Sequence, residues 1–296
     1  MLSPSVFWTS VTGVVFLAAG LAAYRRDFAG THKLDRLVAL GPALFAAPLA
    51  AFGAEHLTSA RAIAEIVPKW MPGHLFWAYF VGLALLAGAL SLVVRRYVSL
   101  TAVLFAVMFG VFVATIHVPN VALQPRNRIL WAVMLRDTAF GAGGLALAGV
   151  MIRKGRATLG KALIFASRIL FGVPILFFGF EHFLHPEYAP GVPLAKLTPA
   201  WVPMRLFGAD LVGAVLLVAG GAVLLNKWSR LASSCVGLAM VVLTAGLYLP
   251  ILAMAHGTDA LMEGVNYVFD TLLFGGAALL IAGAMPEEEQ DTLAAP

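Results

Sequence analysis

The sequence contains one cysteine and few charged residues. Cys235 is the only cysteine among 296 residues, which excludes a CxxC motif or a disulfide within the chain. Any redox role therefore needs a bound cofactor, and we expect Cys235 to be a buried, inert thiol. Charged residues make up 12% of the chain and hydrophobic residues 61%, with a mean hydropathy of +0.90. This composition excludes a soluble domain.

The sequence also lacks the alternating ten-residue segments that are typical of membrane-spanning strands. It contains long apolar runs instead, and a bilayer core of roughly 30 Å needs about 20 helical residues at 1.5 Å each. We therefore expect an all-α, polytopic membrane protein of about nine transmembrane helices. The runs lie near 5–24, 36–56, 74–94, 98–118, 130–151, 162–183, 204–225, 229–250 and 264–284.

An internal duplication covers most of the chain. The pattern Leu-Phe-x-x-Pro-x-x-x-Phe-Gly-x-Glu-His occupies 44–56 and returns at 170–182. The pattern Trp-x-Pro-x-x-Leu-Phe-x-Ala-x-x-Val-Gly occupies 70–82 and returns at 201–213. An Asp-Thr pair follows at 137–138 and at 270–271. We expect a membrane anchor helix in 1–35, two tandem four-helix bundles in 36–152 and 161–286, and a short acidic tail in 287–296.

Basic residues predict how the chain is oriented. They are concentrated in the connections after the first, third, fifth and seventh apolar runs: Arg25, Arg26, Lys33 and Arg36; Arg95 and Arg96; Arg153, Lys154, Arg156 and Lys161; Lys227 and Arg230. The positive-inside rule places these connections in the cytoplasm, with the N-terminus outside and the C-terminus inside, in a bacterial-type inner membrane. The first run precedes its positive charges, the reverse of a secretory signal, so we expect an anchor. The basic pI is then a topology signal, and no nucleic-acid partner is expected.

Polar residues within the apolar runs are the candidate site. A charged side chain at the centre of a membrane helix costs about 2.5–3.5 kcal/mol, so such residues tend to face the bundle interior and pair. We expect one outward-facing pocket per copy. Three interpretations stay open: ligand binding or proton handling, pairs that only join helices, and side chains that snorkel to the surface. The candidates are Glu55, His56, His117, Arg136 and Asp137 in the first copy and Glu181, His182, Asp210, Tyr248 and Asp270 in the second.

The two copies are not equivalent. His117 aligns with Tyr248, and Arg136 aligns with Phe269. Only the first copy thus has an arginine beside its buried aspartate, a donor suited to a carbonyl, carboxylate or phosphate group. If one site is active, we favour the first.

Two further sets of repeated residues have structural interpretations. Trp70 and Trp201 are expected to lie at a membrane interface as aromatic-belt residues. Pro48 and Pro174 are expected to kink their helices.

Metal and haem are disfavoured as cofactors. Glu55, His56, His117 and Asp137 are ligand types that iron or manganese accepts. Adjacent Glu and His side chains, however, point about 100° apart on a helix, and no HxxxH or ExxH spacing puts two ligands on one face. The sequence therefore predicts no metal site and identifies no cofactor by itself.

These features together resemble the DoxX/DoxD-like membrane proteins. The resemblance rests on Phe-Gly-x-Glu-His at the end of the first helix, Trp-x-Pro before the second, a third helix that ends near proline, and an aspartate in a Gly/Ala-rich fourth. Family members usually have one such unit, whereas this chain has two. The resemblance implies a redox-associated, accessory or quinone-contacting subunit rather than a stand-alone enzyme. It also implies other membrane or periplasmic redox subunits as partners, with His56, His117 or Arg136 as donors to a quinone.

Two other classes of function remain open from the sequence. A small-molecule or proton-linked transporter fits a duplicated chain, although the cytoplasmic halves of the helices are almost free of polar residues. A non-catalytic scaffold or assembly factor would use the same charges only to join helices.

Overall fold

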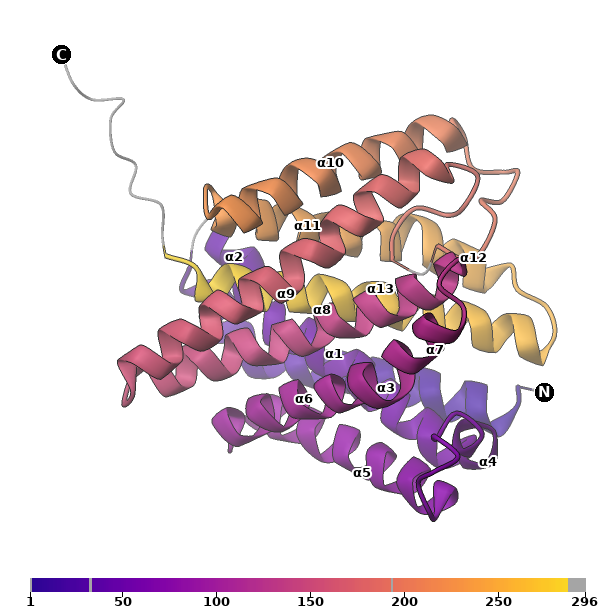
Figure 1. Ribbon diagram of the computed structural model, residues 1–296, viewed down its shortest axis with the longest axis horizontal. Coiled ribbons are helices and arrows are strands. Elements are labelled where there is room, and N and C mark those ends of the chain that lie inside the picture. The colour runs from indigo at the N-terminus through magenta and orange to yellow at the C-terminus, as the bar shows by residue number, and fades with distance from the viewer. Residues whose placement is uncertain (1, 32–33, 193, 287–296) are drawn as a thin grey trace.

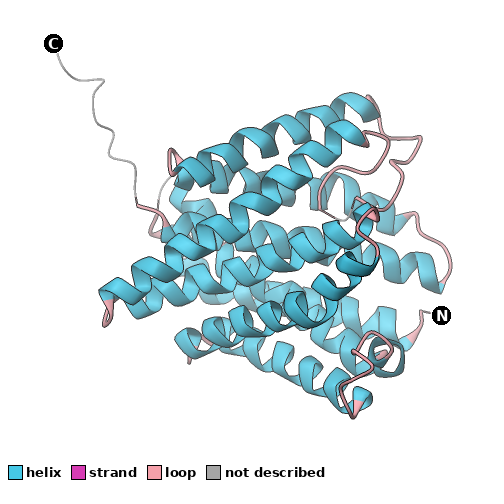
Figure 2. Ribbon diagram, in the orientation of Figure 1, coloured by secondary structure: helices cyan, strands magenta, loops and turns pink. Residues whose placement is uncertain are grey.

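The computed structural model describes residues 2–31, 34–192 and 194–286. Lys33 and the acidic segment 287–296 of the sequence analysis lie outside these residues. The described chain is all helical, and its only β-type pairing is an isolated bridge between Tyr188 and Leu197. Figure 2 shows this absence of strands in the described part of the chain.

Nine membrane-length helical segments are present in the described residues, which confirms the all-α polytopic class. Several are built from more than one helix, and a short α4 (Ala60–Ala64) follows the second segment (Figure 1). The segments are α1 (Pro4–Ala29); α2 (Leu34–Ala39) with α3 (Gly41–Thr58); α5 (His74–Val93); α6 (Val98–Phe112) with π-helix η1 (Val113–His117) and α7 (Val118–Leu123); α8 (Arg128–Arg153); α9 (Ala157–Leu184); α10 (Arg205–Leu225); α11 (Ser229–Leu243) with π-helix η2 (Thr244–Tyr248) and α12 (Leu249–Ala253); and α13 (Thr258–Ala284).

Most segments extend beyond the apolar runs that predicted them. The run at 5–24 lies within α1, which continues to Ala29, and the run at 264–284 lies within α13, which starts at Thr258. Backbone hydrogen bonding continues past the last apolar side chain, so composition alone underestimates helix length. The helices also continue through Pro48 and Pro174.

The two copies interlock instead of forming two separate bundles. The fourth helix of the second copy, α13, packs against α3 of the first copy and against α8 and α11. The fourth helix of the first copy, α8, packs in turn against α9 of the second. Figure 1 shows α13 in the middle of the molecule, between the helices of the first and second copies. The fourth helices therefore belong to the packing of both copies.

Small residues allow this close approach of the central helices. A Cβ atom on Gly276 would lie 2.6 Å from the backbone nitrogen of Phe45, and one on Gly143 would lie 2.7 Å from the Cβ of Ala277. Close backbone approach through Gly and Ala is how membrane helices gain van der Waals contact, because burying apolar side chains away from lipid gains little.

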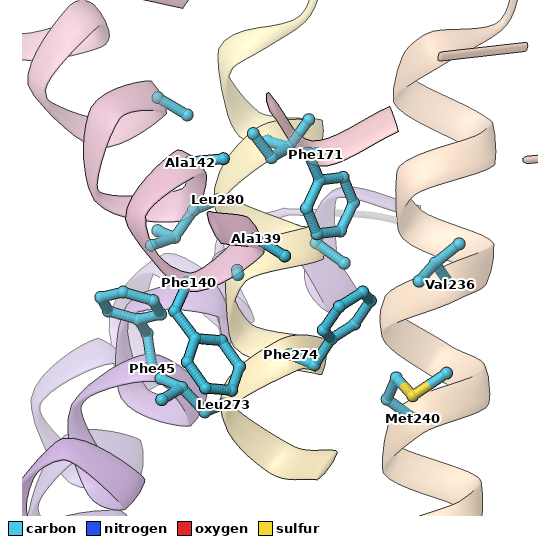
Figure 3. Packing of buried hydrophobic residues seen from close by; sticks show 14 of the residues in the cluster. Phe45, Ala139, Phe140, Ala142, Phe171, Val236, Met240, Leu273, Phe274 and Leu280 are labelled. Carbon is cyan, nitrogen blue, oxygen red and sulfur yellow. The ribbon is translucent and has the colours of Figure 1, made fainter. Parts of the chain in front are cut away.

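Aromatic side chains fill the space between the central helices (Figure 3). The ring of Phe274 on α13 lies 5.3 Å from that of Phe171 and 6.5 Å from that of Phe140, measured between centroids. Phe45 and Phe171 occupy equivalent positions in the two copies and are both fully buried. This core fixes the register of α8 and α13, the two helices that carry the buried aspartates.

Helix α1 packs mainly along α3 of the first copy and also contacts α13 of the second, where Phe269 lies against Gly13. Along α3, Gly20 approaches Ala43 and Gly13 approaches Ala51. Helix α9, the counterpart of α3 in the second copy, exposes Leu170, Val173 and Phe180 instead. Bulky apolar side chains on α9 suit contact with lipid, whereas the alanines of α3 suit contact with a helix.

Cys235 differs from its prediction. Its neighbours Ser234 and Val236 are buried on α11, but Cys235 is exposed. Successive residues of a helix point about 100° apart, so Cys235 lies outside the packed face.

Candidate functional site

A buried polar network joins three helices near the middle of the bundle. His117 Nε2 lies 2.8 Å from Asp137 Oδ2, and Arg136 Nε donates to Asp137 Oδ1 at 3.3 Å. Arg136 Nη1 donates to Asp270 Oδ2 at 2.6 Å. The exposed fraction is 8% for Asp137 and 7% for Asp270. The network thus runs from η1 through α8 to α13.

A π-helical turn positions His117. The backbone N–H of Val118 donates to the carbonyl of Val113, five residues back, in place of the usual four. Pro119 follows and has no N–H to continue the regular ladder. The wide turn inserts an extra residue, which changes the direction of His117 relative to the preceding helix, and π-turns of this kind occur frequently at functional sites.

Helix α13 presents a polar face toward the first copy. Asn266 Nδ2 donates to Glu55 Oε1 at 3.2 Å, so Glu55 of the first copy is held by the second. Tyr267 donates to Glu263 Oε1 at 2.8 Å, and Lys196 Nζ lies 2.7 Å from Glu263 Oε2. Sequence reasoning missed Glu263, Asn266 and Tyr267. These three residues and Asp270 are spaced so that they share one face of the helix, and this spacing could have identified them from the sequence.

The network contains more acidic than basic groups. Asp137 and Asp270 accompany one guanidinium and one imidazole, and Glu55, which is bonded to Asn266, adds a third carboxylate nearby. Even with His117 protonated, full ionisation would leave one net negative charge. A net charge buried at membrane depth is costly, so such a cluster favours the uptake of at least one further proton. The charge balance therefore favours one of the three carboxyl groups in its protonated form.

A cavity of about 160 Å³ lies beside Asp137. Asp137 is the only ionisable residue in its wall, and the Thr138 hydroxyl is bonded to the Met134 carbonyl. The exposed residues Gly110 and Leu170 lie on this wall, so the cavity opens to the surface between α6 and α9. Its lining consists of Ala106, Phe109, Gly110, Val113, Asp137, Thr138, Gly141, Leu145 and Leu170.

The second-copy candidates hold a loop. Gly191 N–H donates to His182 Nε2 at 2.9 Å, and Tyr248 donates to the carbonyl of Pro190 at 2.9 Å. Glu181 Oε2 lies 3.6 Å from Arg128 Nη1, which also donates to the carbonyl of Leu194 at 3.0 Å. His182, Tyr248 and Arg128 thus bind the backbone of the loop, and Glu181 lies beside Arg128.

The expectation of one outward-facing pocket per copy stays a prediction, but the candidates are not grouped copy by copy. Arg136 of the first copy pairs with Asp270 of the second, and His182 and Tyr248 bond the backbone of the loop. The sequence could not reveal this, because α8 and α13 are distant in the chain.

The remaining candidates lie outside the network. His56 contacts the carbonyl of Phe52 through Nδ1 at 2.8 Å. Asp210 is exposed on α10, away from the other candidates. Trp70 and Trp201 are exposed, in connections at the same end of the bundle.

No group of three or more His, Cys, Asp or Glu side chains is arranged to hold a metal ion in the residues that the structure describes. Comparisons of the chain with family models, with curated proteins and with solved structures find no match. The site's chemistry is therefore the guide to function.

Proposed function

We propose that the protein is an integral membrane subunit of a redox complex and that it holds a quinone head group in the cavity beside Asp137. The observation that carries the proposal is a single ionisable group, Asp137, in the wall of an apolar cavity that opens toward the lipid-facing surface. Lipid-soluble quinones reach their sites from the bilayer. A ring could enter between α6 and α9 while its isoprenoid tail stays in lipid.

The cavity volume is that of a site for one six-membered ring. An apolar cavity of about 150 Å³ holds a benzene molecule, and the cavity here is about 160 Å³. The ring of Phe109 lies in its wall and provides an aromatic surface for stacking. Asp137 is the polar group that would fix the ring's orientation, in keeping with the usual division between apolar walls and few polar contacts.

The pair of His117 and Asp137 supplies a proton path. Reduction of a quinone to a quinol takes up two electrons and two protons, and the electrons would come from a partner dehydrogenase subunit. A proton for the ring oxygen would pass from the imidazole of His117, 2.8 Å away, through the Asp137 carboxylate. Arg136 holds Asp137 from the other side and is itself bonded to Asp270.

The resemblance to DoxX/DoxD-like proteins agrees with this proposal. The same proposal places the chain in a bacterial-type inner membrane with its N-terminus outside. Its support is that the connections richest in Lys and Arg, including 94–97, 154–156 and 226–228, lie at one end of the bundle.

A scaffold role is the second candidate, and one observation favours it. Arg136 and Asp270 join the two copies through a buried ion pair. Such a pair could serve assembly alone. The two functions differ in whether the cavity must stay open.

Equilibrium binding of a short-tailed quinone, decylubiquinone, to the full chain in lipid nanodiscs tests the proposal. Gly110→Leu adds a bulky side chain at the cavity wall, and nothing lies within 4 Å of the added Cβ to clash with it. Gly221→Leu on α10 has an equally open environment and is the control. We expect Gly110→Leu and Asp137→Asn to weaken binding at least tenfold and Gly221→Leu to leave it unchanged. Equal binding by all four proteins, or none by the parent chain, would overturn the proposal.

A further inference from the structure

The two copies differ in what covers the ends of their helices. The connection 185–204 of the second copy forms a hairpin, in which Ala189 N–H donates to Lys196 O at 2.8 Å and Thr198 N–H donates to Glu187 O at 2.9 Å. Its tip is buried at Pro190, Gly191 and other residues within the bundle. The corresponding connection 59–73 of the first copy is shorter, and only Ala60 is buried in it.

The hairpin tip is bound by side chains that recur in the first copy. His182 and Tyr248 hold it through Gly191 and Pro190. Their counterparts are His56 and His117. His56 bonds the carbonyl four residues back through Nδ1, as His182 does. Among the described residues its Nε2 atom has no hydrogen-bond partner, whereas that of His182 accepts from the hairpin.

Burial of the surrounding residues confirms that the first-copy equivalent is uncovered. Below the hairpin, the exposed fraction is 7% for Leu247, 1% for Tyr248, 5% for Ile251 and 8% for Tyr267. The counterparts Ile116, His117 and Met134 are only half-buried, and Asn120 is exposed. We call these four residues and His56 the first-copy face.

We propose that the first-copy face binds a hairpin loop of a partner membrane subunit. The hairpin 185–204, bound to the equivalent residues of the second copy, shows the geometry that such a loop would have. Its tip would present a backbone N–H to His56 Nε2 and a carbonyl to the imidazole of His117, above the apolar side chains of Ile116 and Met134. This inference rests on the different covering of the two copies and does not require quinone binding.

The first-copy face should bind a partner loop that is less polar than the chain's own hairpin 185–204. Arg128, which donates to the carbonyl of Leu194 and lies beside Glu181, has Leu261 as its counterpart. Leu261 thus supplies no guanidinium at the position equivalent to Arg128. Backbone hydrogen bonds to the imidazoles and apolar contact carry the recognition, as in other complexes where main-chain groups supply affinity.

Site-specific photocrosslinking in native membranes tests this inference. A benzoylphenylalanine replaces the exposed Asn120 of the full chain, and the same group at exposed Met254 of α12's end is the control. We expect the Asn120 probe to give one crosslinked polypeptide, with the attachment point in a loop between two of its apolar segments. Crosslinks to lipid only, or the same products from both probes, would overturn the inference.

Cysteine accessibility provides a second, independent measurement. In a Cys235→Ser background, Ile116→Cys and its counterpart Leu247→Cys are labelled with a maleimide. We expect Ile116→Cys to react at least tenfold faster than Leu247→Cys in the purified chain and to become tenfold slower in native membranes. His56→Phe, which removes the acceptor and adds bulk, is expected to restore the fast rate in membranes. Equal rates for Ile116→Cys in both preparations would contradict partner binding, and quinone affinity of the purified chain is measured separately.

Discussion

Arg136 of α8 and Asp270 of α13 form an ion pair that connects the two copies of the duplication. Their closest atoms are 2.6 Å apart, and the same guanidinium lies 3.3 Å from Asp137. One cation thus compensates two buried carboxylates on helices from different halves of the chain. The geometry of the cavity and the packing of the copies therefore depend on one side chain.

Replacing Arg136 by methionine should destabilise the protein strongly. Breaking one partner of a buried pair costs about 3–5 kcal/mol, because the other charge stays buried without compensation. We expect Arg136→Met to lower the free energy of unfolding by this amount, measured by denaturant titration in mixed micelles.

The double variant Arg136→Met/Asp270→Leu should regain part of the loss, because no unpaired charge remains at 270, while Asp137 keeps only its contact with His117. Asp210→Leu is the control for removing an exposed carboxylate and should change stability by less than about 0.5 kcal/mol. A double variant no more stable than Arg136→Met would contradict the assigned pairing.

Replacing Pro119 by alanine should move His117 away from Asp137. Alanine restores the N–H that proline lacks, which favours a regular α-helix over the π-turn. Removing the extra residue would rotate His117 by about 100° relative to the preceding helix. We expect decylubiquinone affinity to fall at least tenfold while the thermal unfolding midpoint stays within a few degrees.

Pro250→Ala is the matched control for Pro119→Ala, since Pro250 follows η2 in the second copy. It should leave quinone affinity unchanged, because Tyr248 holds the hairpin rather than the cavity. Loss of affinity in both variants would point to a general effect of the π-turns.

Length and hydropathy were sufficient to predict the class of the fold and its nine spans, because each span satisfies its backbone hydrogen bonds internally. They could not predict how the copies interlock. A periodic pattern shows which face of a helix is polar, but the partner of that face depends on tertiary packing. Asp137 and Asp270 were therefore identified as candidates, while the bond from Arg136 to Asp270 was not.

The hairpin 185–204 was likewise predictable only in part from the sequence. The longer spacing between His182 and Trp201 than between His56 and Trp70 is visible in the sequence. Its insertion into the bundle depends on the contacts of Pro190 and Gly191 with side chains from other segments. Asn266 was missed because an amide carries no charge and does not stand out in an apolar helix.

Replacing Gly191 by alanine should loosen the hairpin. Gly191 has a φ of +127°, and an added Cβ would lie 3.1 Å from the hydroxyl oxygen of Tyr248. Backbone strain and the contact together should lower the free energy of unfolding by about 2–3 kcal/mol. The measurement is denaturant titration together with the rate of proteolysis within 185–204.

Gly257→Ala separates these two contributions. Gly257 also has a positive φ, of +86°, but nothing lies within 4 Å of an added Cβ. We expect a loss of about 1 kcal/mol from the backbone alone and no faster cleavage in 185–204. If Gly257→Ala matched Gly191→Ala in both measurements, the contact with Tyr248 would not hold the hairpin.

Replacing Gly276 by alanine should separate α13 from α3. The added Cβ would lie 2.6 Å from the nitrogen of Phe45 and 2.7 Å from the carbonyl carbon of Leu44. These are backbone atoms, so no side-chain rotation relieves the clash and the helices must move apart. Overpacking of this kind costs about 1–3 kcal/mol and exceeds the gain in helix propensity of about 1 kcal/mol. Gly221→Ala has the same gain with nothing within 4 Å of its Cβ, so denaturant titration should show Gly276→Ala destabilised and Gly221→Ala equal to or slightly more stable than the parent chain. Equal stabilisation of both variants would mean that α13 and α3 are not in backbone contact, which would contradict the interlocked packing of the two copies.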